Sequence, residues 1–81
     1  MNQVVFTKSA SKEFKALPPD IQRQLSNKIK GLAENALPDG VKKLKGTSGY
    51  RLRSGDYRIL YDITGTTVKI FAVGNRKDIY R

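Results

Sequence analysis

The chain contains neither cysteine nor histidine among its 81 residues. The absence of both excludes a disulfide, a zinc site of the usual type and any nucleophilic site built around histidine. No apolar run approaches the roughly 20 residues that span a bilayer, and the opening MNQVVFTKSA lacks the charged-then-apolar layout of a signal peptide. We therefore expect a cytoplasmic protein that contacts no membrane and needs no metal or other cofactor.

Acidic residues are also few, with 7 Asp and Glu against 16 Lys and Arg, for a net charge of +9. The imbalance is concentrated in one half: residues 1–41 carry 6 − 4 = +2, and residues 42–81 carry 10 − 3 = +7. The scattered carboxylates form no spaced pair for acid/base chemistry or Mg²⁺ binding. A strongly basic surface is typical of proteins that bind nucleic acid or another polyanion, although it also serves simply for solubility.

The first half of the chain predicts one strand and two helices. Val4–Phe6 is a short β-prone run, and Thr7 or Ser9 can cap the helix that follows it. Pro18 ends this helix, and Pro19 suits the first turn of the next, which runs to about Asn35. Apolar residues recur at helical spacing in both segments: Ala10, Phe14 and Leu17 in the first, and Ile21, Leu25, Ile29, Leu32 and Ala33 in the second.

The stretch from Tyr50 to Arg81 predicts two hairpins, with tight turns at Ser54-Gly55 and Thr64-Gly65. Counting outward from these turns gives the expected partners: Leu52 opposite Tyr57, Arg51 opposite Arg58, Arg58 opposite Phe71, Leu60 opposite Lys69 and Ile59 opposite Ile70. Side chains alternate across a strand, so one face of the sheet is predicted to form the core. That face carries Tyr50, Leu52, Tyr57, Ile59, Tyr61, Ile63, Val68, Ile70 and Ala72. The other face carries Arg51, Arg53, Arg58, Asp62, Thr67 and Lys69, with Leu60, Phe71 and Val73 among them.

This order predicts a single α+β domain over residues 1–81. It is a two-layer sandwich, β-α-α-β-β-β, with a mainly antiparallel sheet packed on a two-helix hairpin. One face of the sheet is covered by helices, and the arginine-bearing face is left to solvent or a ligand. The residues from Val41 to Gly49 are expected to form a loop. The place of the first strand in the sheet is left open.

The candidate site consists of cations with aromatic rings beside them. Its members are Arg51, Arg53, Arg58, Arg76, Lys77 and Arg81, with Phe71 and Tyr80. Arginine stabilises charge that develops on a phosphate, and an aromatic ring stacks on an unpaired base. RNA carries its own nucleophile, the 2′-OH, so such a site needs no metal to cleave it. Lys42, Lys43 and Lys45 are either phosphate contacts or a solvated loop, and Tyr80 alone could equally be a packing residue.

Two runs, Tyr50-Arg51-Leu52-Arg53-Ser54-Gly55-Asp56-Tyr57-Arg58-Ile59-Leu60-Tyr61 and Val73-Gly74-Asn75-Arg76-Lys77-Asp78-Ile79-Tyr80, carry a family resemblance. With the two-helix hairpin, they resemble the RelE toxins of type II toxin–antitoxin systems, within the RelE/ParE superfamily. The resemblance implies an endoribonuclease that cuts mRNA in the ribosomal A site and is silenced by a cognate antitoxin.

The resemblance also implies roles for single residues. By position, Arg58 matches the arginine on the scissile phosphate, Arg76 the arginine at the leaving group and Tyr80 the stacking tyrosine. Arg51 stands where the best-known members have a catalytic lysine, and arginine is a poor general base. Arg53 matches a neighbouring basic position. Independently of the resemblance, the further RNA contacts predicted from charge and position are Lys42, Lys43, Lys45, Phe71, Lys77 and Arg81.

Three positions depart from relatives, and two other functions remain open. Gly49 replaces a second lysine of some members, Asn75 stands where many have histidine, and Ile79 replaces a histidine before the terminal tyrosine. The predicted function is a metal-independent mRNA interferase. The alternatives are a ParE-like inhibitor of DNA gyrase without nuclease activity, since that branch shares the fold, and a module that binds RNA or ribosomes without cutting.

Overall fold

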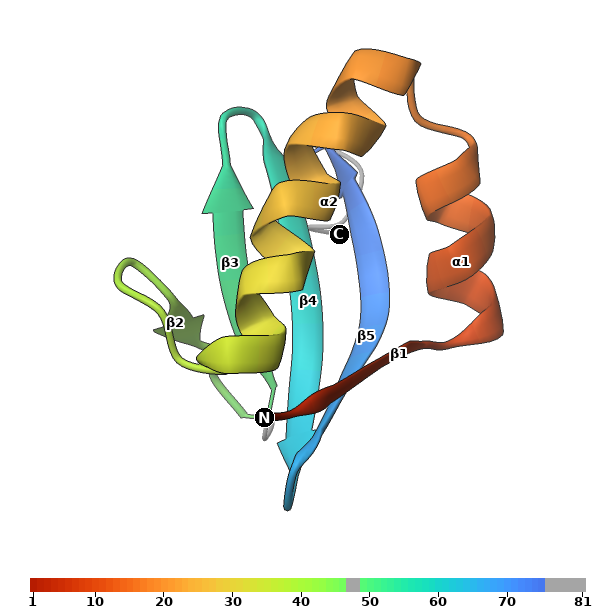
Figure 1. Ribbon diagram of the computed structural model, residues 1–81. Coiled ribbons are helices and arrows are strands. Elements are labelled where there is room, and N and C mark those ends of the chain that lie inside the picture. Colours follow the sequence, from red (N-terminus) through yellow and green to blue (C-terminus); the bar gives the residue numbers. More distant parts are fainter. Residues whose placement is uncertain (47–48, 76–81) are drawn as a thin grey trace.

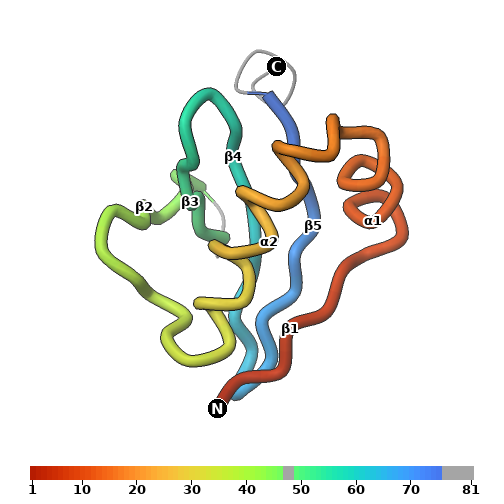
Figure 2. Tube along the Cα trace, turned by 45° about the horizontal axis from the view of Figure 1, so that its top comes forward, coloured from red at the N-terminus to blue at the C-terminus, as the bar shows by residue number. Residues whose placement is uncertain are grey.

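The computed structural model describes residues 1–46 and 49–75. In chain order its elements are β1 (Gln3–Phe6), α1 (Lys8–Lys15), α2 (Pro19–Glu34), β2 (Lys42–Lys43), β3 (Tyr50–Ser54), β4 (Tyr57–Thr64) and β5 (Thr67–Asn75). The sheet order is β1-β5-β4-β3-β2. Both helices pack on one side of the sheet (Figures 1 and 2). The predicted α+β sandwich is confirmed.

The first strand lies at the edge of the sheet, beside the last. β1 pairs with β5 in parallel, with Val4 opposite Val68 and Phe6 opposite Ile70, and every other pairing is antiparallel. The α1–α2 hairpin lies between β1 and the central strands in the chain, which is the kind of long connection that a parallel pair requires. This pairing settles the place that the sequence pattern left open.

Both helices begin where the sequence predicts, and α2 also ends there. However, α1 ends at Lys15, so Leu17 lies in the connection to α2 and not in the helix as predicted. Thr7 is the N-cap of α1, and its Oγ1 accepts a hydrogen bond of 3.1 Å from the Ala10 amide. Pro19 begins α2, and Asn35 caps its end. The apolar stripe of α2 packs on the sheet and supplies the buried residues Leu25, Ile29 and Leu32.

Tyr61 ties the sheet to the segment that follows α2. Its side chain is fully buried, and its hydroxyl donates a 2.7 Å hydrogen bond to the Ala36 carbonyl. Its ring stacks on Tyr50, with centroids 5.8 Å apart. Burial first, and the neighbouring Tyr50 hydroxyl second, raise the pKa of Tyr61 to about 12.

The predicted strand register is wrong by two residues in the first hairpin. Ser54 lies opposite Tyr57 and Arg53 opposite Arg58, so Gly55-Asp56 forms the two-residue loop. Leu52 therefore faces Ile59 rather than Tyr57, and Arg51 faces Leu60 rather than Arg58. Glycine stands first in the loop with φ of 61°, as a type II′ turn requires. A shift of two keeps each side chain on its predicted face and changes only its partner.

The second hairpin contains a bulge that the alternation could not show. Its loop is Gly65-Thr66, and Tyr61 lies opposite Ile70. The next pair is Leu60 with Ala72, which leaves Phe71 as an extra residue. Beyond the bulge Ile59 pairs with Val73 and not with Ile70 as predicted. Arg58 likewise pairs with Gly74 and not with Phe71.

The bulge also exchanges the faces of two residues. Val73 enters the core at 2% exposed, whereas Ala72 shares the face of Leu60. The prediction had Ala72 in the core and Val73 on the other face. One inserted residue reverses the alternation for the remainder of a strand.

The stretch predicted as a loop holds a short strand. β2 pairs antiparallel with β3, with Lys42 opposite Arg51 and Lys43 opposite Tyr50. The Leu44 amide donates to the Gly49 carbonyl at 2.9 Å and closes this connection. Two lysines carry little strand signal, because β propensity depends on neighbours that the sequence does not identify.

Candidate functional site

The helix-free side of the sheet carries two rows of residues that together form a basic face, which we define by Lys42, Arg51, Arg53 and Arg58. One row runs across four strands as Lys42, Arg51, Leu60 and Ala72. The other runs across three strands as Arg53, Arg58 and Gly74. Residues two apart on a strand share a face, so the rows are neighbours. The sheet thus gathers four cations from three strands.

Arg58 lies at the centre of the second row and is only 7% exposed. Its neighbour on β5 is Gly74, which presents no side chain. Its neighbour on β3 is the exposed Arg53, whose Nε donates to the Gly55 carbonyl at 3.2 Å and so is held toward the hairpin turn. Like charges directly opposite one another cost stability, and an anion bound at this row would relieve the repulsion. The predicted arginine pair thus exists, with Arg53 in the place expected for Arg51.

Phe71 and Leu44 form an apolar cluster beside these rows. A Cβ added at Gly49 would lie 3.0 Å from the Leu44 Cδ1 and 3.3 Å from the Phe71 ring. Contacts this short require one of these side chains to move. A side chain at this position, where some relatives carry a second lysine, therefore requires Leu44 or Phe71 to shift by a few tenths of an ångström, so Gly49 is coupled to the aromatic ring predicted to contact RNA.

The remaining predicted site residues are not among the four that define the basic face. Lys43 lies opposite Tyr50, whose ring packs against the core. Lys43 therefore does not belong to the row of Lys42 and Arg51 on the basic face. Lys45 is exposed in the turn after β2. Arg76, Lys77, Tyr80 and Arg81 lie outside the described residues. The structure therefore brings together Arg51, Arg53 and Arg58 with Lys42, and Phe71 lies beside them.

The described residues hold no cluster of three or more carboxylate, imidazole or thiol side chains that could bind a metal ion. Asp62 lies opposite Lys69 across β4 and β5. Within residues 1–46 and 49–75, no helix has the length and apolar character needed to cross a bilayer. The basic face itself supplies the positive charge of Lys42, Arg51, Arg53 and Arg58.

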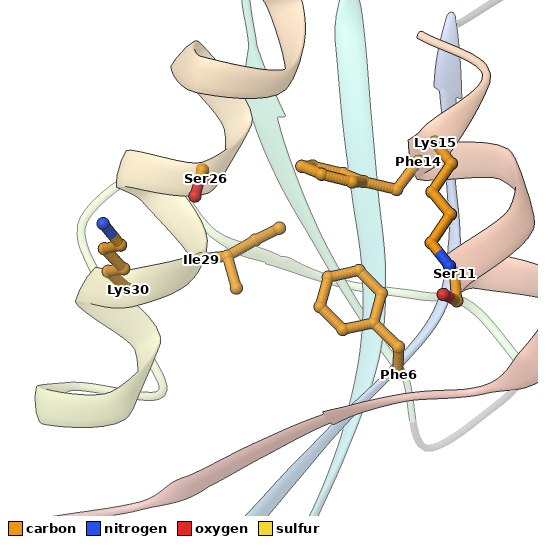
Figure 3. Close-up of a pocket in the computed structure, with 7 residues that line it drawn as sticks. All are labelled: Phe6, Ser11, Phe14, Lys15, Ser26, Ile29 and Lys30. Carbon is orange, nitrogen blue, oxygen red and sulfur yellow. The ribbon is translucent and has the colours of Figure 1, made fainter.

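A pocket between the helices was not predicted from the sequence. Its volume is about 200 Å³, and it is lined by Phe6, Ser11, Phe14, Lys15, Ser26, Ile29 and Lys30 (Figure 3). Phe6 and Phe14 meet edge to face, 5.7 Å apart, and Phe6 remains 37% exposed. The only sequence feature that could have indicated this pocket is Phe6, an aromatic residue at the end of an edge strand, and such a residue is equally consistent with a core position.

The fold is shared with a class of small toxins. The family model described as the ParE toxin of type II toxin–antitoxin systems matches residues 4–80. The chain belongs to this family, and within the RelE/ParE superfamily it is a RelE-type toxin.

A named relative and several solved structures match nearly the whole chain and support its assignment to this family. Toxin RelE3 of Methanocaldococcus jannaschii is 35% identical, with 96% of this chain and 94% of that protein covered. The RelBE2 toxin–antitoxin complex of Mycobacterium tuberculosis has a TM-score of 0.83 at 31% identity, covering 93% and 98%. The intact RelBE complex of E. coli has a TM-score of 0.80 at 28% identity, covering 93% and 96%.

Proposed function

We propose that this toxin is a metal-independent endoribonuclease that cuts mRNA in the ribosomal A site. The observation that carries the proposal is the arginine row at the centre of the sheet, in which Arg58 is fixed mid-strand and nearly buried between Arg53 and Gly74. A charge held rigidly stabilises a phosphorane without reorganising during the reaction.

In the proposed reaction the 2′ oxygen of one nucleotide attacks the adjacent phosphorus. The new bond to the 2′ oxygen forms as the bond to the 5′ oxygen breaks, which leaves a 2′,3′-cyclic phosphate and a 5′-hydroxyl. The 2′-OH proton passes to solvent, and the 5′ oxygen takes one from solvent. Arg58 holds the phosphate, and Lys42, Arg51 and Arg53 hold the backbone on either side. By the family resemblance, Arg76 neutralises the leaving group and Tyr80 stacks on the base.

The basic face contributes charge and orientation rather than a general base. Its described cations are arginines and a lysine, and arginine stays protonated throughout the neutral range. Holding the phosphate and the 2′ oxygen in line therefore supplies the rate enhancement in this proposal, together with the neutralisation of developing charge.

A cleavage assay on programmed ribosomes tests this function. We expect discrete cuts in the A-site codon, with products that end in a cyclic phosphate, and no cuts in the same RNA without ribosomes. Primer extension on cellular mRNA after induction should show cuts within reading frames. Ribosome binding without cuts would instead identify a non-cleaving module.

The family description itself favours a second candidate, inhibition of DNA gyrase, because it names ParE. Supercoiling of plasmid DNA by purified gyrase discriminates between the two. Loss of supercoiling at toxin concentrations that leave ribosome-bound mRNA intact would assign the chain to that branch. Unaffected supercoiling with cut mRNA would reject it.

We also propose a cognate antitoxin that covers the basic face with an acidic segment. Several relatives are solved as complexes with a RelB antitoxin, and the basic face offers four cations to such a partner. Binding to the folded state alone raises stability by mass action, by about 2.7 kcal/mol at a hundredfold excess over Kd. We expect the product of the adjacent gene to raise the melting temperature by several degrees.

Two charge reversals locate the antitoxin contact. Arg53→Glu, on the basic face, should abolish most of the increase in melting temperature. Lys30→Glu, on the rim of the pocket in Figure 3, should leave it intact. The opposite pattern would place the antitoxin on the helix pair, and an unchanged melting temperature for the wild-type chain would contradict the partnership.

A further inference from the structure

β5 extends beyond the strand beside it. The pairing with β1 ends at Phe6 and Ile70, and the Thr7 amide donates the last hydrogen bond of that edge to the Ile70 carbonyl at 2.9 Å. β5 continues to Asn75, paired on its other side with β4. Over this last stretch α1 lies beside β5 in place of a strand (Figure 1). A side chain of α1 can therefore reach the outer edge of β5.

Glu13 makes such a contact. Its Oε1 accepts a 3.1 Å hydrogen bond from the Val73 amide, 60 residues away in the sequence. Glu13 is the only acidic residue of α1, whose sequence KSASKEFK otherwise carries three lysines. A carboxylate on a strand-edge amide makes a charge-assisted hydrogen bond and closes an edge that would otherwise be open for pairing.

The bonded amide lies next to the arginine row. Val73 follows the bulge at Phe71, where the ladder is interrupted, and Gly74 is the row partner of Arg58. An extra residue in a strand leaves the ladder locally weaker. The strand end is thus held by β4 on one side, and on the other side the hydrogen bond to Glu13 fixes the backbone of Val73.

We propose that Glu13 is a positioning residue, which holds the Val73–Gly74 backbone and thereby fixes the place of Arg58 for binding the phosphate. This inference rests on the proposed function, because it assigns Glu13 to the same site. Glu13 does not touch the RNA in this proposal. It acts through a hydrogen bond from the helix layer, on the opposite side of the sheet from the arginines.

The test compares Glu13→Ala with Glu13→Gln, which retains an amide oxygen that can accept the same bond. The matched control is Glu34→Ala, an exposed glutamate at the end of α2. In Glu13→Ala we expect amide exchange at Val73 to accelerate at least about tenfold, and the Gly74 amide and Arg58 Nε–H signals to shift. Glu13→Gln and Glu34→Ala should retain the wild-type exchange rate and spectrum.

Cleavage supplies the second measurement. The single-turnover rate at saturating toxin should fall about tenfold in Glu13→Ala, and Glu13→Gln should restore most of it. The proposal is overturned if Val73 exchange is unchanged in Glu13→Ala, or if exchange accelerates while cleavage and the Arg58 signal stay at wild-type values. If the wild-type chain cuts no RNA, the proposed function fails, and the spectra still decide whether Glu13 and Arg58 are coupled.

Discussion

Replacing Arg58 by alanine is expected to lower the cleavage of ribosome-bound mRNA by about 10²–10³-fold, the usual loss for one charge-stabilising donor. The side chain is 7% exposed and lies on a central strand, so its charge is held in place rather than mobile in solvent. Because the interaction is expected to strengthen as charge develops on the phosphate, the turnover rate should fall more than the affinity for ribosomes.

Stability should change little in the same variant, because two effects oppose each other. Alanine removes the repulsion between Arg58 and Arg53, which are directly opposite. It also removes the packing of a nearly buried aliphatic stem. We expect the free energy of unfolding to change by no more than about 1 kcal/mol, as measured by urea denaturation alongside the cleavage assay.

A matched control separates position from charge. Arg23→Ala removes the same charge from the exposed surface of α2, in the other layer, and should leave cleavage at the wild-type rate. Arg76→Ala should lose activity as Arg58→Ala does if the family resemblance assigns it correctly. Toxicity and cleavage that survive in both site variants would refute the phosphate clamp and favour the gyrase-directed branch.

The fold was predictable from the sequence because its main signals are local. The apolar stripe of α2, the proline pair before it and the threonine cap of α1 each act within a few residues. The faces of β3 and of most of β4 were also predictable, since alternation survives a register error of two. These signals sufficed to place Arg51, Arg53 and Arg58 on one face.

The arrangement within that face was not predictable. The partner of Arg58 depends on where each loop begins, and a glycine at the first loop position moves every pair by two residues. The bulge at Phe71 depends on packing between strands and exchanges the faces of Ala72 and Val73. The hydrogen bond from Val73 to Glu13 spans 60 residues, and no periodicity encodes a contact of that length.

Between pH 10 and 12 the protein is expected to lose about 2 to 3 kcal/mol of stability through a single buried hydroxyl. The pKa of Tyr61 is raised to about 12, first by burial and second by Tyr50. The folded state therefore favours the neutral phenol, whereas the unfolded chain ionises near pH 10. A group whose pKa is raised by folding contributes fully below its unfolded pKa, and that contribution disappears as the pH rises through the folded pKa.

The test is Tyr61→Phe, followed by urea denaturation at a series of pH values from 7 to 12. At pH 7 the variant should be less stable by about 1 kcal/mol, because the Ala36 carbonyl loses the 2.7 Å hydrogen bond. Above pH 10 its stability should fall less steeply than that of the wild type, so the two curves should meet and cross between pH 10 and 12. Tyr57→Phe removes a hydroxyl from a half-buried ring and serves as the control. Equal slopes for wild type and Tyr61→Phe would show that folding does not raise the pKa of Tyr61, and that another group governs alkaline unfolding.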